Sequence, residues 1–566
     1  MATIAFINTG RYTSSRGNTS FSDPVHLVAM HNLAKQGGYT SRVFQLGSPT
    51  GEQSIEEIYH YNPDILGLSF LAPFKGDIEL VDGLLSLFRN RNIKLFLGGP
   101  DIQFDPKFYI SRFGGDRINE WAQCVLVDGP GERLVETLLP HNFDIEAPEV
   151  EQQLTELGGT ITNRDGVYLV RGLPEVSLDE QNHSRDYDLS QFQNKAGVKW
   201  ATGCWAACSF CPNIPGKSKY KAPALVAEEM EYLRSLGAQK LDIASPQFTA
   251  HPKLASGVVG ALPPDTLPVF FSSRVDSLFH AITRYPDEWK RFANSNTHGI
   301  GLGVDSFLPE KLVRMRKYNS IAQARQQDER LHTVLSFFSE TRLNIVFYMI
   351  TFEWQMCLEE VQLELEALMD CLNKYSSTLQ IAPENVTNVL SHNRGSHFAK
   401  TMKPIDFLRF ERDPRLFVML YSMYSMHELM EDIIIRSEES HELMEAAAAR
   451  LMVKFGLKML KLLCHVPSEQ ANFETSFATL GDTLGHIFME GQDAYRSERV
   501  LDQLLDVYPP KPQKKLRKFI AKEEKTMEKS LLREYDILLT RKVLFRMKQE
   551  GKMDERTLLR KLRKYQ

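Results

Sequence analysis

Three of the chain's seven cysteines, Cys204, Cys208 and Cys211, lie within eight residues in the string GCWAACSFCP at 203–212. Three thiolates spaced Cys-x3-Cys-x2-Cys on one loop can bind three irons of a [4Fe–4S] cluster, which leaves the fourth iron open for a small chelating ligand. A structural zinc site needs four protein ligands, and no further cysteine follows within the next hundred residues, so zinc fits less well. A disulfide would leave one thiol over. Three unrelated cysteines are the remaining alternative.

The composition is that of a globular protein that works in a reducing compartment. The chain has 566 residues, of which 43% are hydrophobic and 25% charged, enough for three or four domains. The four cysteines outside the loop are scattered and suggest no disulfide framework: Cys124, Cys357, Cys371 and Cys464. The N-terminus lacks the charged segment and cleavage site of a signal peptide, and no apolar run reaches the length of a membrane span. We expect a cytoplasmic protein.

The net charge of −5 hides an asymmetry along the chain. Residues 508–566 hold 19 Lys and Arg against 8 Asp and Glu, a local charge of +11, so the rest of the chain carries −16. A basic segment of this kind can attract nucleic acid, anionic lipid or another acidic surface. A solvated helical tail is the simpler interpretation, and we expect this tail to be peripheral because its charge is costly to bury.

The first 140 residues alternate between apolar strands and amphipathic helices. Helical patterns, for example at 24–35 and 77–88, separate the apolar runs. Continuous apolar strands with helical crossovers predict a parallel sheet that is covered on both faces. The five predicted strands are 3–8, 42–46, 65–71, 94–97 and 124–127.

Small and glycine-rich turns follow these strands at the edge where parallel sheets bind ligands. Glycine there lets a backbone approach a bulky ligand closely. The candidate ligand-binding residues are Asn8 and Thr9 after the first strand, Ser69, Phe70, Leu71 and Ala72 after the third, Gly98, Gly99 and Pro100 after the fourth, and Gly129, Pro130, Gly131 and Glu132 after the fifth.

Residues 196–385 carry the cysteine loop and about six βα units, fewer than a full eight-stranded barrel. The predicted strands are 198–202, 240–244, 269–272, 300–304, 345–350 and 378–381. Between the two α/β regions, residues 141–195 are weakly periodic and are predicted to be a linker, with a hairpin around the turn at 163–166.

The C-terminal third is predicted to be helical. Met419, Met423, Met426 and Met430 recur every three or four residues, which is more typical of a core stripe than of a cofactor site. The string HELME occurs at 427–431 and again at 441–445, two heptads later; in an unbroken helix both copies would share a face. Metal binding by these His and Glu residues is less probable than coincidence. A proline-rich break at 508–512 precedes the basic tail.

The cysteine spacing followed by a βα pattern resembles the radical S-adenosylmethionine (SAM) enzymes, in which the open iron binds the amino and carboxylate groups of SAM. The resemblance implies SAM contacts at Gln247, Arg274, Asp305 and Ser306, where Asp305 replaces the more usual Glu and Gln247 a more usual acidic residue. The turn after the fifth barrel strand lacks the family's Gly-x-Pro.

The glycine-rich strand ends resemble the cobalamin-binding domain that precedes many radical SAM barrels. The cobalt-ligand signature Asp-x-His-x-x-Gly is missing from this domain, as it is in many cobalamin-dependent radical SAM enzymes, so the resemblance implies cobalamin bound base-off without a histidine on cobalt. A degenerate Rossmann-like domain that binds nothing is the alternative. The loop at 69–73 would lie under the cobalt.

The predicted fold class is therefore α/β, with a Rossmann-like cobalamin-binding domain at 1–140, a linker at 141–195, a partial (β/α)6 radical SAM barrel at 196–385, a helical substrate-capping domain at 386–505 and a basic helical tail at 506–566. The implied cofactors are a [4Fe–4S] cluster, SAM and cobalamin. The implied activity is C-methylation of a small molecule, natural-product precursor or peptide, with electrons from a donor such as flavodoxin or ferredoxin. A cyclase or rearranging oxidoreductase with the same cofactors is the second hypothesis. A non-catalytic redox or cobalamin-responsive binding protein is the third.

Overall fold

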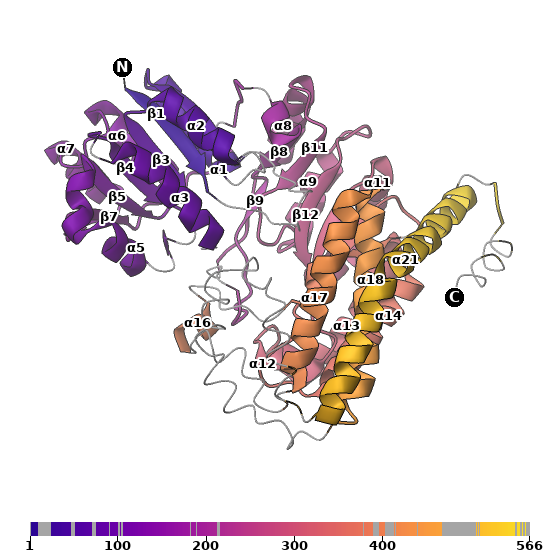
Figure 1. The fold of residues 1–566 in the computed structure, drawn as a ribbon. Helices are drawn as coiled ribbons and strands as arrows, with labels where there is room; N and C mark the ends of the chain where they lie inside the picture. Colours follow the sequence, from indigo (N-terminus) through magenta and orange to yellow (C-terminus); the bar gives the residue numbers. More distant parts are fainter. Residues whose placement is uncertain are drawn as a thin grey trace. The chain divides into compact units, whose positions relative to one another are not determined.

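The computed structural model describes the chain except for residues 1, 10–23, 47–50, 71–74, 90, 100–101, 104–105, 182, 188, 212–215, 377, 389–395, 402–412, 414, 438–439, 467–504, 506–507, 509, 550–551, 555–556, 558–560 and 562–566. The chain folds into two compact units (Figure 1). The first comprises Met1–Ala201, Lys219–Ala244 and Arg394–Ser396, and the second comprises Thr202–Ser218, Ser245–Asn393 and His397–Gln566.

A seven-stranded sheet forms the centre of the first unit. Its strand order is β2-β1-β3-β4-β5-β7-β6, and every pair is parallel except β6 with β7. The strands are β1 (Thr3–Asn8), β2 (Thr40–Gln45), β3 (Ile65–Ser69), β4 (Lys94–Gly98), β5 (Gln123–Asp128), β6 (Thr160–Arg164) and β7 (Val167–Arg171). The predicted parallel sheet is confirmed.

Alternation along the buried strands sends side chains to two separate core layers. In β1, Ala5 and Ile7 pack with α2, α3 and α5, whereas Ile4 and Phe6 pack with α1, α6 and α7. Helices therefore cover both faces of the sheet, as the continuous apolar strands predict. These helices are α1 (Val25–Gln36), α2 (Gly51–Tyr61), α3 (Lys75–Phe88), α5 (Pro106–Phe113), α6 (Gly131–Leu138) and α7 (Pro148–Glu156), with short 3-10 turns η1 (Gly115–Glu120), η2 (Leu139–His141) and η3 (Leu189–Phe192).

The predicted hairpin in the linker forms and extends this sheet. Strands β6 and β7 are joined by Asp165 and Gly166, which both have positive φ, of 52° and 83°. A two-residue turn with this backbone matches the twist of antiparallel strands. The amide N–H of Gly166 also donates to Asn163 Oδ1 over 3.1 Å. Because β7 pairs with β5, part of the segment predicted as a linker belongs to the first unit's sheet.

The first unit also contains the start of the second βα series. Strands β8 (Lys195–Val198) and β11 (Lys240–Ile243) are parallel, with α8 (Pro223–Ser235) between them in sequence. The buried Glu229 of α8 accepts hydrogen bonds from the Trp200 indole over 3.0 Å and from Lys221 over 2.8 Å. Although burial alone would raise the pKa of Glu229, His183 and Lys221 lower it to about 2. This network fixes Trp200, four residues before Cys204. The short strands β9 (Ala201–Thr202) and β10 (Lys219–Tyr220) flank the cysteine loop.

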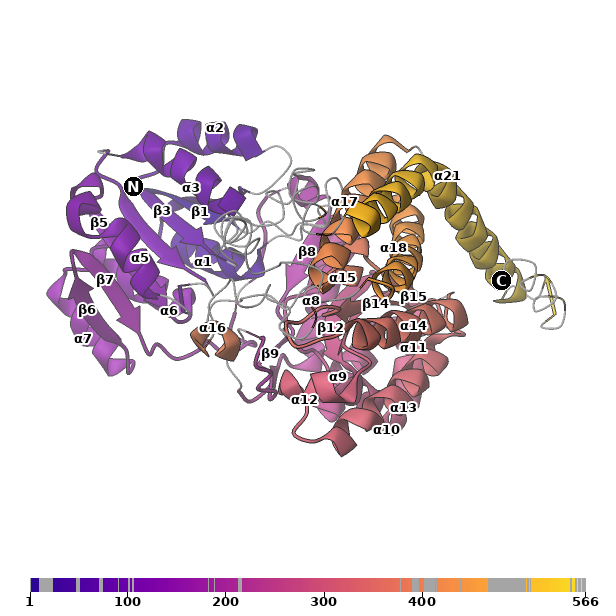
Figure 2. The same ribbon diagram turned by 60° about the horizontal axis from the view of Figure 1, so that its bottom comes forward.

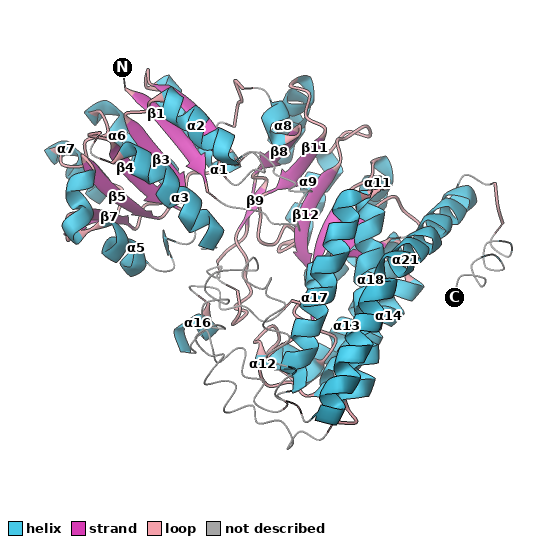
Figure 3. Ribbon diagram, in the orientation of Figure 1, coloured by secondary structure: helices cyan, strands magenta, loops and turns pink. Residues whose placement is uncertain are grey.

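In the second unit, β12 (Val269–Arg274), β13 (Gly299–Asp305), β14 (Asn344–Met349) and β15 (Leu379–Ile381) pair in parallel in chain order. Five of the six strands predicted for the barrel region form close to their predicted bounds, whereas the strand predicted at 198–202 overlaps β8 only at Val198 and β9 at Ala201–Thr202. Helices separate them in sequence, as Figure 3 shows. These are α9 (Pro252–Ala261), α10 (Val275–Arg284), α11 (Pro286–Ser295), α12 (Pro309–Arg314), α13 (Ile321–Phe338) and α14 (Leu358–Lys374).

The C-terminal part of the second unit is helical. It comprises α15 (Pro383–Val386), α16 (His397–Thr401), α17 (Arg415–Arg436), α18 (His441–Leu463) and α21 (Pro510–Gln549). Figures 1 and 2 both show α17, α18 and α21 side by side, and α18 also contacts α14. The capping role of these helices stays a prediction.

The methionine stripe of α17 is core, as its spacing predicts. All four side chains, at positions 419, 423, 426 and 430, are fully buried. A Cβ added to Gly456 of α18 would lie 2.8 Å from Leu365 Cδ1 on α14 and 3.3 Å from the methyl groups of Met419 and Met423. The glycine therefore permits close packing of α17, α18 and α14. The two HELME strings fall on separate helices, because α17 ends at Arg436 and α18 begins at His441, so the shared-face expectation is wrong.

The basic tail is not peripheral. One face of α21 is buried against α18, with Leu516, Ile520, Met527 and Leu531 nearly inaccessible. Its Glu534 is buried as well and pairs with Arg450 of α18. The expectation failed because it considered the net charge of the segment, whereas an amphipathic helix can bury its apolar stripe and keep its lysines in water. No helix among the described residues combines the length and the hydropathy needed to cross a bilayer.

Candidate functional site

The backbone of the cysteine loop is held by its own return segment and by Met315, all within the second unit. Gly203 has φ of +84°, and a Cβ there would lie 2.4 Å from the Lys217 carbonyl oxygen. The Gly216 N–H donates to the Cys204 carbonyl over 2.8 Å. Further along, the backbone N–H and hydroxyl of Ser209 both donate to the Met315 carbonyl, over 3.0 and 2.7 Å. The loop is therefore anchored on both sides of its cysteines.

Gln247 lies against the first cysteine of the loop. The Cys204 thiol donates to Gln247 Oε1 over 2.9 Å, and Gln247 Nε2 donates to the Ser277 hydroxyl over 2.5 Å. The Gln247 side chain is only 1% exposed, and the adjacent Phe248 N–H donates to the carbonyl of Ser272 in β12. The predicted SAM residue thus lies beside Cys204, a predicted cluster ligand, and Ser277 fixes its orientation.

Arg274, at the end of β12, lies against the second cysteine. Its Nη1 donates to Cys208 Sγ over 3.1 Å, its Nε to Asp276 Oδ1 over 3.2 Å, and its Nη2 to the Lys317 carbonyl over 3.1 Å. The guanidinium carbon also lies 5.1 Å from the centre of the Trp205 ring. Burial alone would lower the pKa of Arg274, but the Asp276 carboxylate and Cys208 raise it above its usual range. The guanidinium is therefore held in place by protein groups.

Asp305 and Lys317 form a second charged pair at the neighbouring strand end. The register of β13 shifts between Gly303 and Asp305, and Asp305 has φ of +61°. The buried Lys317 ammonium lies 2.7 Å from Asp305 Oδ2 and donates to the carbonyls of Gly303 and Val304 over 2.6 and 2.9 Å. Burial lowers the pKa of Lys317, and Asp305 opposes that shift. The Asp305–Lys317 pair thus stabilises the irregular end of β13.

The fourth predicted SAM residue, Ser306, is fully buried and hydrogen-bonded within the protein. Its hydroxyl donates to Glu364 Oε2 over 3.1 Å, and Glu364 is paired with Lys311 over 3.1 Å. Both charged side chains are completely buried, and Lys311 also donates to the carbonyls of Ile350 and Thr351 after β14. A buried ion pair with all its bonds made fixes neighbouring segments. Ser306 thus helps to join the loops that follow β13 and β14.

The surroundings of Cys204 and Cys208 favour the neutral thiol over the thiolate. Burial raises the pKa of Cys204 and of Cys208, and the nearby Arg274 opposes both shifts. A metal binds the thiolate form of cysteine, so binding of a metal or cluster to these thiols should release protons. Among the residues that the structure describes, no three His, Cys, Asp or Glu side chains are placed to hold a single metal ion.

The predicted cobalamin residues of the first unit contact one another at the carboxyl ends of β1 and β3. The Thr9 hydroxyl donates to the Ser69 carbonyl over 2.9 Å, and the Ser69 hydroxyl lies 2.8 Å from His26 Nε2. Burial and the charge of Lys199 lower the pKa of His26 to about 4, so the imidazole is neutral at pH 7. Leu71, Ala72 and Pro100 lie outside the described residues.

Two buried oxygens at this edge make no hydrogen bond within the described structure: Asn8 Oδ1 and Glu132 Oε1. The Asn8 amide nitrogen is already used, because it donates to Gln45 over 2.8 Å. The nearest cation to Glu132 is Lys199, at 3.9 Å. Buried acceptors without donors are costly, and they suit a ligand that brings amide N–H groups.

The glycines at this edge are explained by the protein's own packing. Gly99 has φ of +103°, and a Cβ there would lie 2.3 Å from the Phe70 carbonyl oxygen. A Cβ on Gly131 would lie 2.6 Å from Met30 Sδ. Of the other predicted contacts, Gly98 ends β4, Gly129 has φ of +157° and Pro130 is the N-cap of α6. Phe70 is a core residue that packs against Tyr109. Packing alone therefore accounts for glycine at Gly99 and Gly131, and their contact with a ligand stays a prediction.

Several residues of the site could not be read from the cysteine motif. Lys317 lies 43 residues from Arg274 in sequence, so only the fold brings the two together, whereas Asp276 lies two residues after Arg274 and carries no motif signal. Trp205 could have been noted as an aromatic residue inside the cysteine motif. In the structure, 52% of its surface is accessible. His26 lies at the start of α1, far from Ser69 in sequence.

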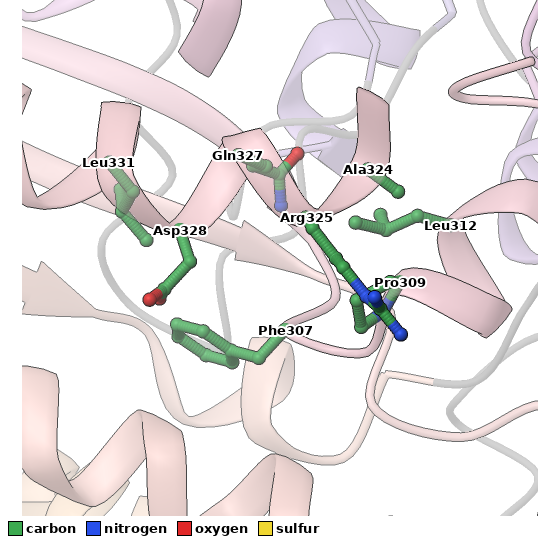
Figure 4. A pocket seen from close by; sticks show the side chains of 8 residues that line it. All are labelled: Phe307, Pro309, Leu312, Ala324, Arg325, Gln327, Asp328 and Leu331. Atoms are coloured by element: carbon green, nitrogen blue, oxygen red, sulfur yellow. The ribbon is translucent and has the colours of Figure 1, made fainter. Parts of the chain in front are cut away.

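A cavity of about 290 Å³ lies elsewhere in the second unit, between the start of α12 and α13. In Figure 4 it lies between Asp328 and Phe307 on one side and Arg325 and Pro309 on the other. None of the cysteines and none of the predicted SAM residues line it. Gln327, which lines this cavity, nevertheless contacts the candidate site, because it donates to the carbonyls of Val304 and Ser306 on either side of Asp305.

Comparison with known proteins identifies the fold. No model of a protein family matches the sequence, and no curated protein matches it either. Two structures of the cobalamin-dependent SAM radical enzyme OxsB, one with aqua-cobalamin bound and one without ligand, match with a TM-score of 0.61 at 13% identity. They cover 100% and 96% of this chain and 84% of OxsB. The radical SAM methyltransferase TsrM from Kitasatospora setae, with tryptophan and a SAM analogue, matches 74% of this chain and 82% of its own at 14% identity, with a TM-score of 0.49. The chain thus shares the fold of a cobalamin-dependent radical SAM enzyme over its whole length.

Proposed function

We propose that this protein is a cobalamin-dependent radical SAM enzyme that methylates a carbon of a small molecule, natural-product precursor or peptide. The observation that carries the proposal is the convergence of the cysteine loop with Gln247 and Arg274, which follow successive strands of a fold shared with OxsB. A loop of three half-buried thiols, whose backbone is hydrogen-bonded and whose first two cysteines contact polar side chains, fits a cluster with one open iron.

Cys204, Cys208 and Cys211 would hold the [4Fe–4S] cluster. When bound, the cluster supplies an electron that cleaves SAM to methionine and a 5′-deoxyadenosyl radical, which can take hydrogen from an unactivated carbon. Gln247 and Asp305 offer oxygens on this side of the second unit that can accept hydrogen bonds from a SAM amine or ribose. Lys317 holds Asp305 in position, because it also bonds to the carbonyls of Gly303 and Val304, and Ser277 holds Gln247.

The edge of the first sheet would hold cobalamin. When bound, cobalamin supplies a methyl group to the substrate. The two unpaired oxygens, Asn8 Oδ1 and Glu132 Oε1, fit a ligand whose periphery carries amide donors. Thr9 fixes the Ser69 backbone, and the neutral His26 fixes the Ser69 hydroxyl. These contacts keep the end of β3 rigid beside the ligand.

Loss of the cluster is the first test. Cys204→Ala, Cys208→Ala and Cys211→Ala should each abolish cluster loading and SAM cleavage, because each removes one iron ligand. Anaerobic reconstitution of the unchanged protein should give about four irons and four sulfides per chain. The matched control is Cys464→Ala, an exposed cysteine outside the loop, which should load normally. A triple alanine variant that kept its iron and its activity would contradict the proposal.

The products separate the methyltransferase from the other hypotheses. Methylation adds one CH2 to the substrate mass, whereas a cyclase or rearranging oxidoreductase leaves no such gain. Formation of 5′-deoxyadenosine without substrate would exclude a non-catalytic binding protein. We also propose an electron donor of the flavodoxin or ferredoxin kind. The test is to replace dithionite, as the chemical reductant, with the purified carrier and to measure product formation.

A further inference from the structure

Four largely buried charged side chains form two pairs that are linked to Cys208 through Arg274. Arg274 pairs with Asp276 over 3.2 Å, and Lys317 pairs with Asp305 over 2.7 Å. The pairs are joined, because Arg274 Nη2 donates to the Lys317 carbonyl over 3.1 Å. Their formal charges cancel, so loss of any one member leaves a net charge next to the cysteine.

Arg274 differs from the other three because it bonds directly to the sulfur. Its Nη1 lies 3.1 Å from Cys208 Sγ. The remaining guanidinium nitrogens are occupied by Asp276 and by the Lys317 carbonyl, and the Trp205 and Tyr318 rings lie 5.1 and 5.6 Å from the guanidinium carbon. The donor is thus pointed at the sulfur before any ligand is present. Hydrogen bonds to cluster sulfurs and local net charge are two of the factors that set the potential of an iron–sulfur centre.

We propose that this quartet sets the reduction potential of the cluster, with Arg274 favouring the reduced state and Asp305 favouring the oxidised state. The inference rests on the proposed function, because it takes Cys208 as an iron ligand. Reduction adds one negative charge to the cluster and its thiolates. A cationic donor on a ligand sulfur stabilises that added charge, and a carboxylate nearby opposes it.

The test is a potentiometric titration of the reconstituted cluster in the absence of SAM, followed by electron paramagnetic resonance. Without SAM, any contact between Arg274 and SAM plays no part in the result. We expect Arg274→Gln to lower the ratio of reduced to oxidised cluster about tenfold at a fixed potential, which for one electron equals a shift of about 59 mV to lower potential. Asp305→Asn should shift the ratio by a similar factor in the opposite direction. Asparagine also tolerates the positive φ at this position.

Two further variants control for structural damage. Arg274→Lys keeps the charge but loses the planar fork, so its shift should be smaller than that of Arg274→Gln. Arg316→Gln removes an exposed cation next to Lys317 in sequence and should leave the potential unchanged. If Arg274→Gln fails to bind iron, the direction of the potential shift in Asp305→Asn and in Arg274→Lys still tests the inference.

The outcomes distinguish this inference from the proposed function. If the unchanged protein binds no four-iron cluster, the proposed function fails. If it binds the cluster and the Arg274 and Asp305 variants shift in the same direction or not at all, the inference fails while the proposed function stands. A loss of SAM affinity in Arg274→Gln at unchanged potential would make Arg274 a SAM ligand instead, and would also overturn the inference.

Discussion

Glu534→Gln tests whether the basic C-terminal helix is an integral part of the second unit. Glu534 is buried on α21 and accepts from Arg450 Nε over 2.6 Å and from Lys454. Arg450 is itself buried and donates to the Leu372 carbonyl and to Asn373. The substitution keeps the shape of the side chain but leaves the Arg450 charge without its carboxylate.

The magnitude follows from the burial of both partners. Removing one member of a buried ion pair typically costs about 3–5 kcal/mol, because the other charge stays buried and unpaired. If α21 opens as a local unit, each 1.4 kcal/mol changes the opening equilibrium about tenfold. Amide hydrogens of α21 that exchange through this opening should therefore exchange on the order of 10²- to 10³-fold faster in the variant.

Hydrogen–deuterium exchange with peptide-level mass spectrometry is the assay. The control is Glu523→Gln on the same helix, whose partner Lys458 is 55% exposed. An exposed pair contributes about 1 kcal/mol or less, so exchange in the control should change by less than about tenfold. Equal protection of α21 in the two variants would refute the view that Glu534 anchors this helix.

The same pair predicts a pH dependence. Burial alone would raise the pKa of Glu534, but the hydrogen bonds from Lys454 and Arg450 lower it below its usual value. A lowered folded-state pKa means that the stabilisation is complete above the unfolded pKa of about 4.3 and is lost as the pH falls through the folded value. Protection of α21 in the unchanged protein should therefore fall in acid, and Glu534→Gln should lack this part of the response.

Two further predictions concern the first unit. Gly99→Ala should destabilise the cofactor-free protein by about 1–3 kcal/mol or more, because the positive φ is strained for alanine and the added Cβ meets the Phe70 carbonyl. Thermal unfolding measures this loss. The control is Gly83→Ala in α3, which should stabilise the protein slightly. The cob(II)alamin form should show no nitrogen splitting from an axial ligand in its electron paramagnetic resonance spectrum, because the sequence lacks the cobalt-ligand signature. Splitting that disappears in His26→Ala would assign the ligand and contradict the base-off expectation.

Local sequence determined the elements of this protein. The apolar runs of the first 140 residues and their helical spacers predicted a parallel sheet, because strands buried on both faces must be apolar throughout. The Asp165-Gly166 turn predicted its hairpin, because both residues accept positive φ. The spacing of Met419, Met423, Met426 and Met430 predicted a core stripe. Each of these signals depends on residues close together in the chain.

The composition of the cysteine loop determined the chemistry that we propose, and the strand ends identified Gln247, Arg274 and Asp305 as members of the same site. Their partners were not predictable. The resemblance implies a SAM contact at Arg274, which stays a prediction, and the structure adds its bonds to Cys208 and Asp276. Ser306 was expected to face SAM, and its hydroxyl bonds to Glu364.

Only the tertiary structure decided the contacts of Arg274 with Cys208 and of Ser306 with Glu364, because they join residues that lie tens of positions apart. Glu364 meets Ser306 and Lys311 through the packing of α14 on the ends of β13 and β14. The C-terminal tail shows the same limit, because its net charge predicted a peripheral segment. In the structure, α21 packs on α18 through Leu516, Ile520 and Leu531 and through the ion pair between Glu534 and Arg450. Net charge is a sum over residues, and burial depends on which of them share a face and what that face meets.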